Sequence, residues 1–170
     1  MLPTSQEKVP PIVPAGLHLA SFVRRIVGIV VDQIVITVPV FALFYAFGFM
    51  PKDAITEGRA VWFTVTLTAL GLTYETVGIW LWGRTLGKLL ARTRAVSIVD
   101  GGRLGFVRSF QRSLVPTTLS AIPQVGPLLG IAVYVYAFFD PLRQGVHDKA
   151  AGSIVVHGHG TPAQPPAPEL

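Results

Sequence analysis

Isolated charged side chains interrupt two long apolar runs, and this feature most constrains how the chain can fold. The first run, residues 26–50, contains Asp32 and Pro39, and the second, residues 60–82, contains Glu75. As a helix that rises about 1.5 Å per residue, either run can cross a hydrocarbon core of about 30 Å. Only 14% of the 170 residues are charged, against about 25% in soluble domains. The sequence therefore predicts an integral membrane protein with the lipid bilayer as its partner.

The charge distribution predicts the orientation of the chain in the membrane. The net charge is +5, and seven basic side chains lie between residues 83 and 113 against one acid, Asp100. A basic patch can bind nucleic acid, but beside apolar spans it marks the cytoplasmic side. We therefore expect no nucleic-acid partner, a cytoplasmic amino terminus and an external loop at residues 51–59. The chain has no cysteine, which excludes disulfides, thiolate metal sites and thiol nucleophiles.

The third apolar stretch, residues 114–139, is interrupted near its middle by proline, and two interpretations of it stay open. It can form a short helical hairpin that turns at residues 122–127, or a single straight crossing that places the tail outside. We favour the hairpin because Arg143 and Lys149 follow it, and basic residues mark the cytoplasmic face.

A small β element is predicted within the basic segment. Residues 95–99 are rich in β-branched side chains, and the turn-forming residues 100–102 lead to a short second strand at 103–104, which indicates a β-hairpin. Residues 153–157 are a third candidate strand that would complete a cytoplasmic sheet. The predicted fold is mainly α and polytopic, with two full spans, a proline-broken helical hairpin and this small cytoplasmic β-hairpin or sheet.

The ends of the chain differ in composition from the rest. Residues 1–17 and 158–170 contain several prolines and no apolar periodicity, so we expect disordered tails. Residues 18–157 are expected to form one membrane domain.

The charges inside the apolar runs are the main candidates for a site. Asp32 follows Arg25 by seven residues, so both project from one face of a helix, and Glu75, nine residues before Arg84, reaches a similar depth. A charge at membrane depth costs about 2.5–3.5 kcal/mol, so it usually faces protein or water and finds a partner. We expect the carboxylates to meet the basic side chains of Arg24, Arg25, Arg84 and Lys88. The cluster is either a cation or proton site or a structural ion-pair clasp, and both interpretations stay open.

Two other motifs are weaker. The sequence Gly83-Arg84-Thr85-Leu86-Gly87-Lys88 lacks the spacing of a phosphate-binding loop, so we reject nucleotide binding there. We expect Gly83 to end the second span and Gly87 to allow close backbone packing. His147 and Asp148 lie side by side without a nucleophile motif, so Asp148 is expected to cap a helix or to pair with arginines. We expect no enzyme, no cofactor and no metal site.

The chain resembles the RDD family of bacterial membrane proteins over about residues 18–157. Four ordered motifs carry the resemblance: Ser21-Phe22-Val23-Arg24-Arg25 running into Asp32; Gly83-Arg84-Thr85-Leu86-Gly87-Lys88; the strand from Arg94 to Val99 with Asp100-Gly101; and Arg143-Gln144-Gly145-Val146-His147-Asp148-Lys149-Ala150-Ala151-Gly152.

The resemblance implies a polytopic membrane domain and three family residues. The family arginine maps onto Arg25 or Arg24, the first aspartate onto Asp32, and the second onto Asp148. The resemblance also implies transport of a ligand, and for a few family members this transport is sodium–proton exchange. Two spans and a hairpin enclose no gated path alone, so sodium or proton transport would need a homo-oligomer or another membrane partner. The alternative is a non-catalytic scaffold or assembly factor of the bacterial inner membrane.

Overall fold

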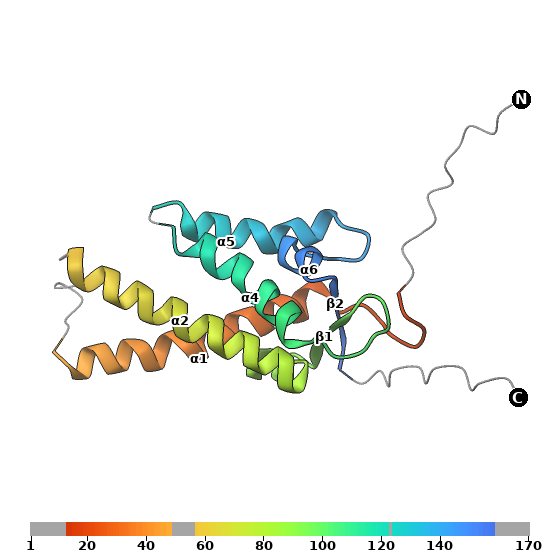
Figure 1. Ribbon diagram of the computed structural model, residues 1–170, viewed down its shortest axis with the longest axis horizontal. Coiled ribbons are helices and arrows are strands. Elements are labelled where there is room, and N and C mark those ends of the chain that lie inside the picture. The colour runs from red at the N-terminus through yellow and green to blue at the C-terminus, as the bar shows by residue number, and fades with distance from the viewer. Residues whose placement is uncertain (1–12, 49–56, 123, 159–170) are drawn as a thin grey trace, which may run out of the picture.

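The computed structural model describes residues 13–48, 57–122 and 124–158. It is mainly helical, with a two-stranded sheet at one end of the long helices (Figure 1). The elements are α1 (Phe22–Ala46), α2 (Glu57–Trp82), α3 (Leu86–Leu90), β1 (Thr93–Ser97), α4 (Phe106–Ser120), α5 (Gly126–Val135), the 3₁₀ helix η2 (Tyr136–Phe139), α6 (Val146–Ala150) and β2 (Ser153–His157).

Helices α1 and α2 occupy the two apolar runs. The side chain of Ser21 caps α1 by accepting a hydrogen bond from the backbone N–H of Arg24, and Pro39 lies inside this helix. Gly83 follows the end of α2 with a φ of 67°, which glycine adopts readily. Within the described residues, α1 is the one helix both long and apolar enough to cross a membrane.

The third apolar stretch folds as a helical hairpin and not as a straight crossing. Helices α4 and α5 pack against each other and run in opposite directions, with the turn between residues 120 and 126 (Figure 1). A Cβ atom on Gly126 would collide with the backbone oxygen of Ser120. A glycine is therefore needed where α5 starts against the end of α4.

The sheet pairs β1 with β2 in antiparallel register, with Thr93 opposite His157 and Ser97 opposite Ser153. The predicted strand 153–157 is confirmed, whereas the predicted β-hairpin to residues 103–104 is wrong. Residues 97–102 form a closed turn. The N–H of Ser97 donates to the backbone oxygen of Gly102, and the N–H of Gly101 donates to the backbone oxygen of Ser97. An isolated hairpin is marginally stable, and pairing with β2 instead buries Ile154 and Val156 completely.

The predicted disordered tail, residues 1–17, extends too far, because the last of these residues belong to the fold. Leu17 is buried in a cluster with Val96 and Ile154, and Val13 packs against this cluster. Leu19 forms a β-bridge with Val156, so the segment before α1 belongs to the fold because it covers the sheet. Residues 1–12 and 159–170 of the predicted tails lie outside the described residues.

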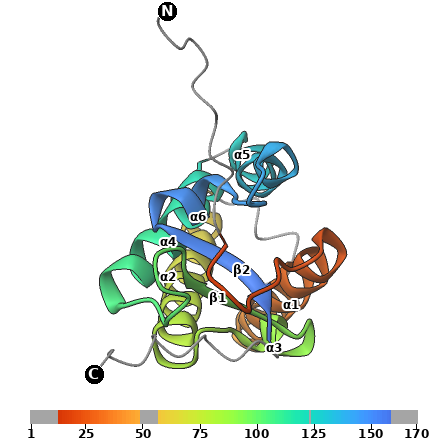
Figure 2. The same cartoon turned by 90° about the vertical axis from the view of Figure 1, so that its right-hand side faces the viewer.

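The sheet and α6 lie at the same end of the long helices (Figure 1), and the view from that end also shows α3 there (Figure 2). Seen from that end, α1, α2, α4 and α5 surround the long axis of the molecule, and β2 and α6 lie in front of them (Figure 2). The hairpin turn stops short of the far end of α2 (Figure 1). The charged residues of interest lie where the long helices meet the elements at the sheet end.

Candidate functional site: a buried ion-pair cluster

A continuous chain of ion pairs connects five helices near the sheet. It contains three cations and three carboxylates, whose formal charges cancel. In spatial order these side chains are Arg25 (α1), Asp148 (α6), Arg112 (α4), Glu75 (α2), Lys88 (α3) and Asp32 (α1). We call these six residues the ion-pair cluster.

Asp148 is the centre of one half of the cluster and is 0% exposed. Arg112 donates from Nε and Nη2 to its Oδ1 at 2.9 and 2.8 Å, and Nη1 of Arg25 lies 3.3 Å from its Oδ2. The N–H of Gly145 also donates to Oδ2, which caps α6. Burial alone would raise the pKa of the Asp148 carboxyl. The cationic form of His147 and the guanidinium groups of Arg112 and Arg25 outweigh burial and hold this pKa well below its usual range.

Asp32 joins α1 to the start of α3. Its carboxylate accepts hydrogen bonds from the Tyr74 hydroxyl at 2.7 Å, the Gly87 N–H at 2.8 Å and the Thr85 hydroxyl at 2.5 Å. Thr85 also caps α3 by accepting from the backbone N–H of Lys88. The predicted close packing at Gly87 is present, because a Cβ there would collide with the backbone oxygen of Gly28 on α1.

Glu75 and Lys88 connect the two halves of the cluster. Glu75 Oε1 lies 3.2 Å from both Lys88 Nζ and Arg112 Nη1. Lys88 Nζ also lies 3.5 Å from Asp32 Oδ2. The carboxylates of α1 and α2 thus share one ammonium group.

The other predicted site residues lie at the edge of the cluster or outside it. Nη1 of Arg24 donates to the backbone oxygen of Ala91 at 3.4 Å, and Arg84 is exposed. His147 is buried, with Nε2 3.6 Å from Asp148 Oδ1 and its ring edge-on to Tyr134.

Sequence reasoning missed Arg112. It belongs to the stretch read as a cytoplasmic basic segment, but its side chain is 2% exposed. The available signal was the small serine side chains of Ser109 and Ser113, which lie on the same buried face of α4 as Arg112.

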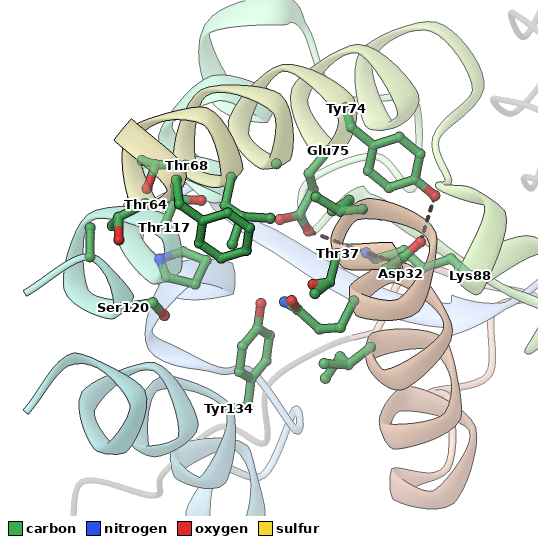
Figure 3. A pocket seen from close by; sticks show the side chains of 18 residues that line it. Asp32, Thr37, Thr64, Thr68, Tyr74, Glu75, Lys88, Thr117, Ser120 and Tyr134 are labelled. Atoms are coloured by element: carbon green, nitrogen blue, oxygen red, sulfur yellow. Dashed lines mark hydrogen bonds and ion pairs between the residues drawn. The ribbon is translucent and has the colours of Figure 1, made fainter. Parts of the chain in front are cut away.

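A polar cavity of about 340 Å³ opens beside the cluster, between α1, α2, α4 and α5 (Figure 3). Asp32, Glu75 and Lys88 form one end of it, and the Tyr134 hydroxyl points into it from α5 (Figure 3). Hydroxyl groups of Thr37, Thr64, Thr68, Thr117 and Ser120 line part of the remaining wall, and apolar side chains such as Ile36, Phe63 and Leu67 line the other part. The cavity therefore offers polar contacts from the cluster to the hairpin turn.

A second cavity of about 310 Å³ lies between α1 and α5 and is lined mainly by apolar side chains. It shares four lining residues with the polar cavity: Ile29, Glu75, Lys88 and Tyr134. These four side chains are the wall between the two cavities.

The buried imidazole of His147 makes folding stability depend on pH. Burial lowers the pKa of His147 from 6.5 to about 4. Between these values the unfolded chain binds a proton that the folded chain does not, so stability falls as pH falls. Across this window we expect a loss of about 3 kcal/mol.

Thermal unfolding in detergent between pH 7 and pH 4.5 measures this loss. His147→Gln should show a much smaller decrease in stability over the same range. His157→Gln, which leaves His147 in place, should keep the decrease of the wild type. A His147→Gln profile as steep as that of the wild type would contradict the assignment.

Comparison with known proteins identifies the family. The model described as the RDD family matches residues 19–152. This range contains every member of the ion-pair cluster. No curated protein and no solved structure matches the chain. Because the family model covers most of the chain, this protein belongs to the RDD family, which is a family of membrane proteins.

Proposed function

We propose that the protein is a multi-pass protein of the bacterial inner membrane, with α1 and α2 as full spans. The α4–α5 hairpin enters the membrane from the cytoplasmic side, where the sheet and both chain ends lie. The support is the apolar outer surface of three helices, because exposed apolar surface of this extent marks contact with lipid or protein. The exposed side chains include Val30, Ile34, Val38 and Phe41 on α1, Trp62, Val65 and Leu70 on α2, and Leu128, Ile131 and Val135 on α5.

Exposed hydroxyl groups on α2 also suit a lipid environment. Thr66 and Thr73 donate to the backbone oxygens of Trp62 and Ala69, four residues earlier, at 2.8 Å each. A polar group in hydrocarbon needs such an internal partner. These threonines therefore do not prevent α2 from spanning the bilayer.

Within this membrane protein, we propose that the ion-pair cluster and the polar cavity move a small cation or protons, in an oligomer. The observation that carries this proposal is the position of the Glu75–Lys88–Asp32 group at the end of a cavity that is lined in part by hydroxyl groups. Ionisable groups at membrane depth that face a polar cavity mark ion pathways.

A second candidate is a non-catalytic scaffold or assembly factor. It is favoured by the pairing within the cluster, where each of the three carboxylates contacts at least one cation within 3.5 Å. Such a neutral, hydrogen-bonded cluster fixes the packing of helices. The two candidates differ in whether ions cross the protein.

Asp32→Asn in reconstituted vesicles separates these candidates. If the cluster moves cations, the wild type should carry sodium, potassium or protons, and the variant should remain folded. A hydrogen bond to a charged group contributes about 1.5–3 kcal/mol, so we expect the flux to fall about tenfold or more.

The control is Asp100→Asn, which changes an exposed aspartate outside the cluster. It should keep the wild-type flux. Wild-type vesicles without flux, together with a large loss of detergent stability in Asp32→Asn, would leave the scaffold as the function.

A further inference from the structure

The ammonium group of Lys88 occupies a cradle of oxygen atoms. Within 3.5 Å of Nζ lie Glu75 Oε1 at 3.2 Å, Thr85 Oγ1 at 3.4 Å and Asp32 Oδ2 at 3.5 Å. These atoms come from α2, the cap of α3 and α1. Carboxylate and hydroxyl oxygens also bind small hard cations. The cradle therefore already binds a cation, which is the ammonium group at the end of the Lys88 side chain.

The cradle opens onto the polar cavity, so an ion in the cavity can reach it. Glu75 and Lys88 line the cavity together with Thr64 and Thr68 of α2 (Figure 3). From Thr64 to Glu75 the rise along the helix is about 16 Å. The threonine hydroxyl groups, which alternate with apolar side chains on this wall, can replace water molecules around a small cation on its way to the cradle.

The charge balance of the cluster determines which cation fits. With the Lys88 ammonium in place, the three cations and three carboxylates cancel. When this ammonium leaves, the remaining five groups carry a net charge of −1. One monovalent cation restores neutrality, whereas a divalent cation leaves an uncompensated buried charge, which is costly.

We infer that this cradle is a binding site for a monovalent cation, an alkali ion or a small ammonium ion, and that Lys88 is its resident occupant. An incoming cation binds when the Lys88 side chain moves aside. The inference deepens the proposed function and rests on it, since it names the site and the competitor of the moving ion. One chain supplies all three oxygen ligands, so the binding site itself needs no second copy.

Lys88→Ala tests this inference by emptying the cradle. Thermal unfolding of the detergent-solubilised full chain is measured in sodium, potassium or methylammonium chloride. The reference is N-methyl-D-glucamine chloride at equal ionic strength, because this organic cation is too large for the cradle. We expect at least one small cation to stabilise the variant saturably. At 100 times its Kd the unfolding temperature should rise by about 5 °C or more, with little change in the wild type.

Three further variants keep the result interpretable. Lys88→Gln fills more of the space with a neutral side chain and covers the case in which Lys88→Ala fails to fold. Lys88→Ala combined with Asp32→Asn removes both a ligand and the net negative charge, so the cation response should disappear. Lys149→Ala removes an exposed lysine that pairs with Asp140, and it should respond as the wild type does.

The outcomes separate this inference from the proposed function. Equal responses of Lys88→Ala, Lys88→Gln, Lys149→Ala and the wild type would overturn the inference, even if wild-type vesicles carry ions. A saturable response of the Lys88 variants without wild-type flux would establish the site and reject transport.

Discussion

Asp148→Asn is expected to lower the free energy of unfolding by about 3–5 kcal/mol, because it removes one partner of a buried ion pair. The carboxylate is fully buried and accepts two hydrogen bonds from Arg112 at 2.8–2.9 Å. The asparagine has no negative charge to balance Arg112 and Arg25. The cluster would then keep a buried net charge of +1.

The variant also weakens the start of α6. Oδ2 of Asp148 accepts from the N–H of Gly145 at 3.1 Å, and it lies 3.3 Å from Arg25 on α1. One side chain thus holds α1, α4 and α6 together. The loss should therefore appear in the packing of the whole helix assembly as well as in the local segment.

Thermal or denaturant unfolding in detergent measures the effect of Asp148→Asn. Asp100→Asn is the matched control, because Asp100 is exposed and accepts hydrogen bonds from nearby groups such as the Gly102 N–H. We expect the control to change stability by less than about 0.5 kcal/mol. A similarly small change in Asp148→Asn would mean that the cluster does not hold the helices together.

Much of the helical framework could be predicted from local patterns. The two apolar runs became α1 and α2, and the proline-broken stretch became the α4–α5 hairpin. Gly83 and Gly87 lie where a helix ends and where two backbones meet, as expected. Apart from the packing partner of Gly87, which is Gly28 on α1, these features depend on residues close in sequence, so the sequence displays them directly.

The partners of the charged side chains could not be predicted in the same way. The cost of burial shows that Asp32 and Glu75 need partners. Lys88, one of the four basic side chains expected to meet them, contacts both, but the sequence did not single it out. Arg25 and Asp148 are 123 residues apart, and Arg112 and Asp148 are 36 apart. Arg112 stands in a basic segment that predicts a cytoplasmic position, and only the packing of α4 against α2 and α6 places it inside.

The pairing of the strands in the sheet also could not be predicted from local patterns. Residues 95–104 carry a good local hairpin signal, yet β1 pairs with β2, which lies more than fifty residues later in the chain. The tail strand buries its apolar side chains against the segment before α1. The free energy gained by this apolar burial outweighs the extra entropy cost of closing a longer loop, because that cost grows only slowly with loop length.

Gly87→Ala is expected to destabilise the protein by about 4–5 kcal/mol, the sum of overpacking and a lost charge-assisted hydrogen bond. The added Cβ would collide with the backbone oxygen of Gly28 and lie 2.7 Å from Cγ of Asp32. A backbone atom cannot rotate away as the end of a flexible side chain can. Helix α3 must therefore move away from α1, which breaks the 2.8 Å hydrogen bond from the Gly87 N–H to Asp32.

Gly105→Ala is the control that isolates this effect. Gly105 precedes α4 with a φ of −67°, and a Cβ there meets nothing within 4 Å. It should change the unfolding temperature little, while Gly87→Ala lowers it strongly or prevents recovery of folded protein. If both variants unfold like the wild type, α3 does not pack against α1 at Gly28. The Asp32 end of the cluster would then lose its backbone donor, and Lys88 would no longer be held next to Asp32 and Glu75.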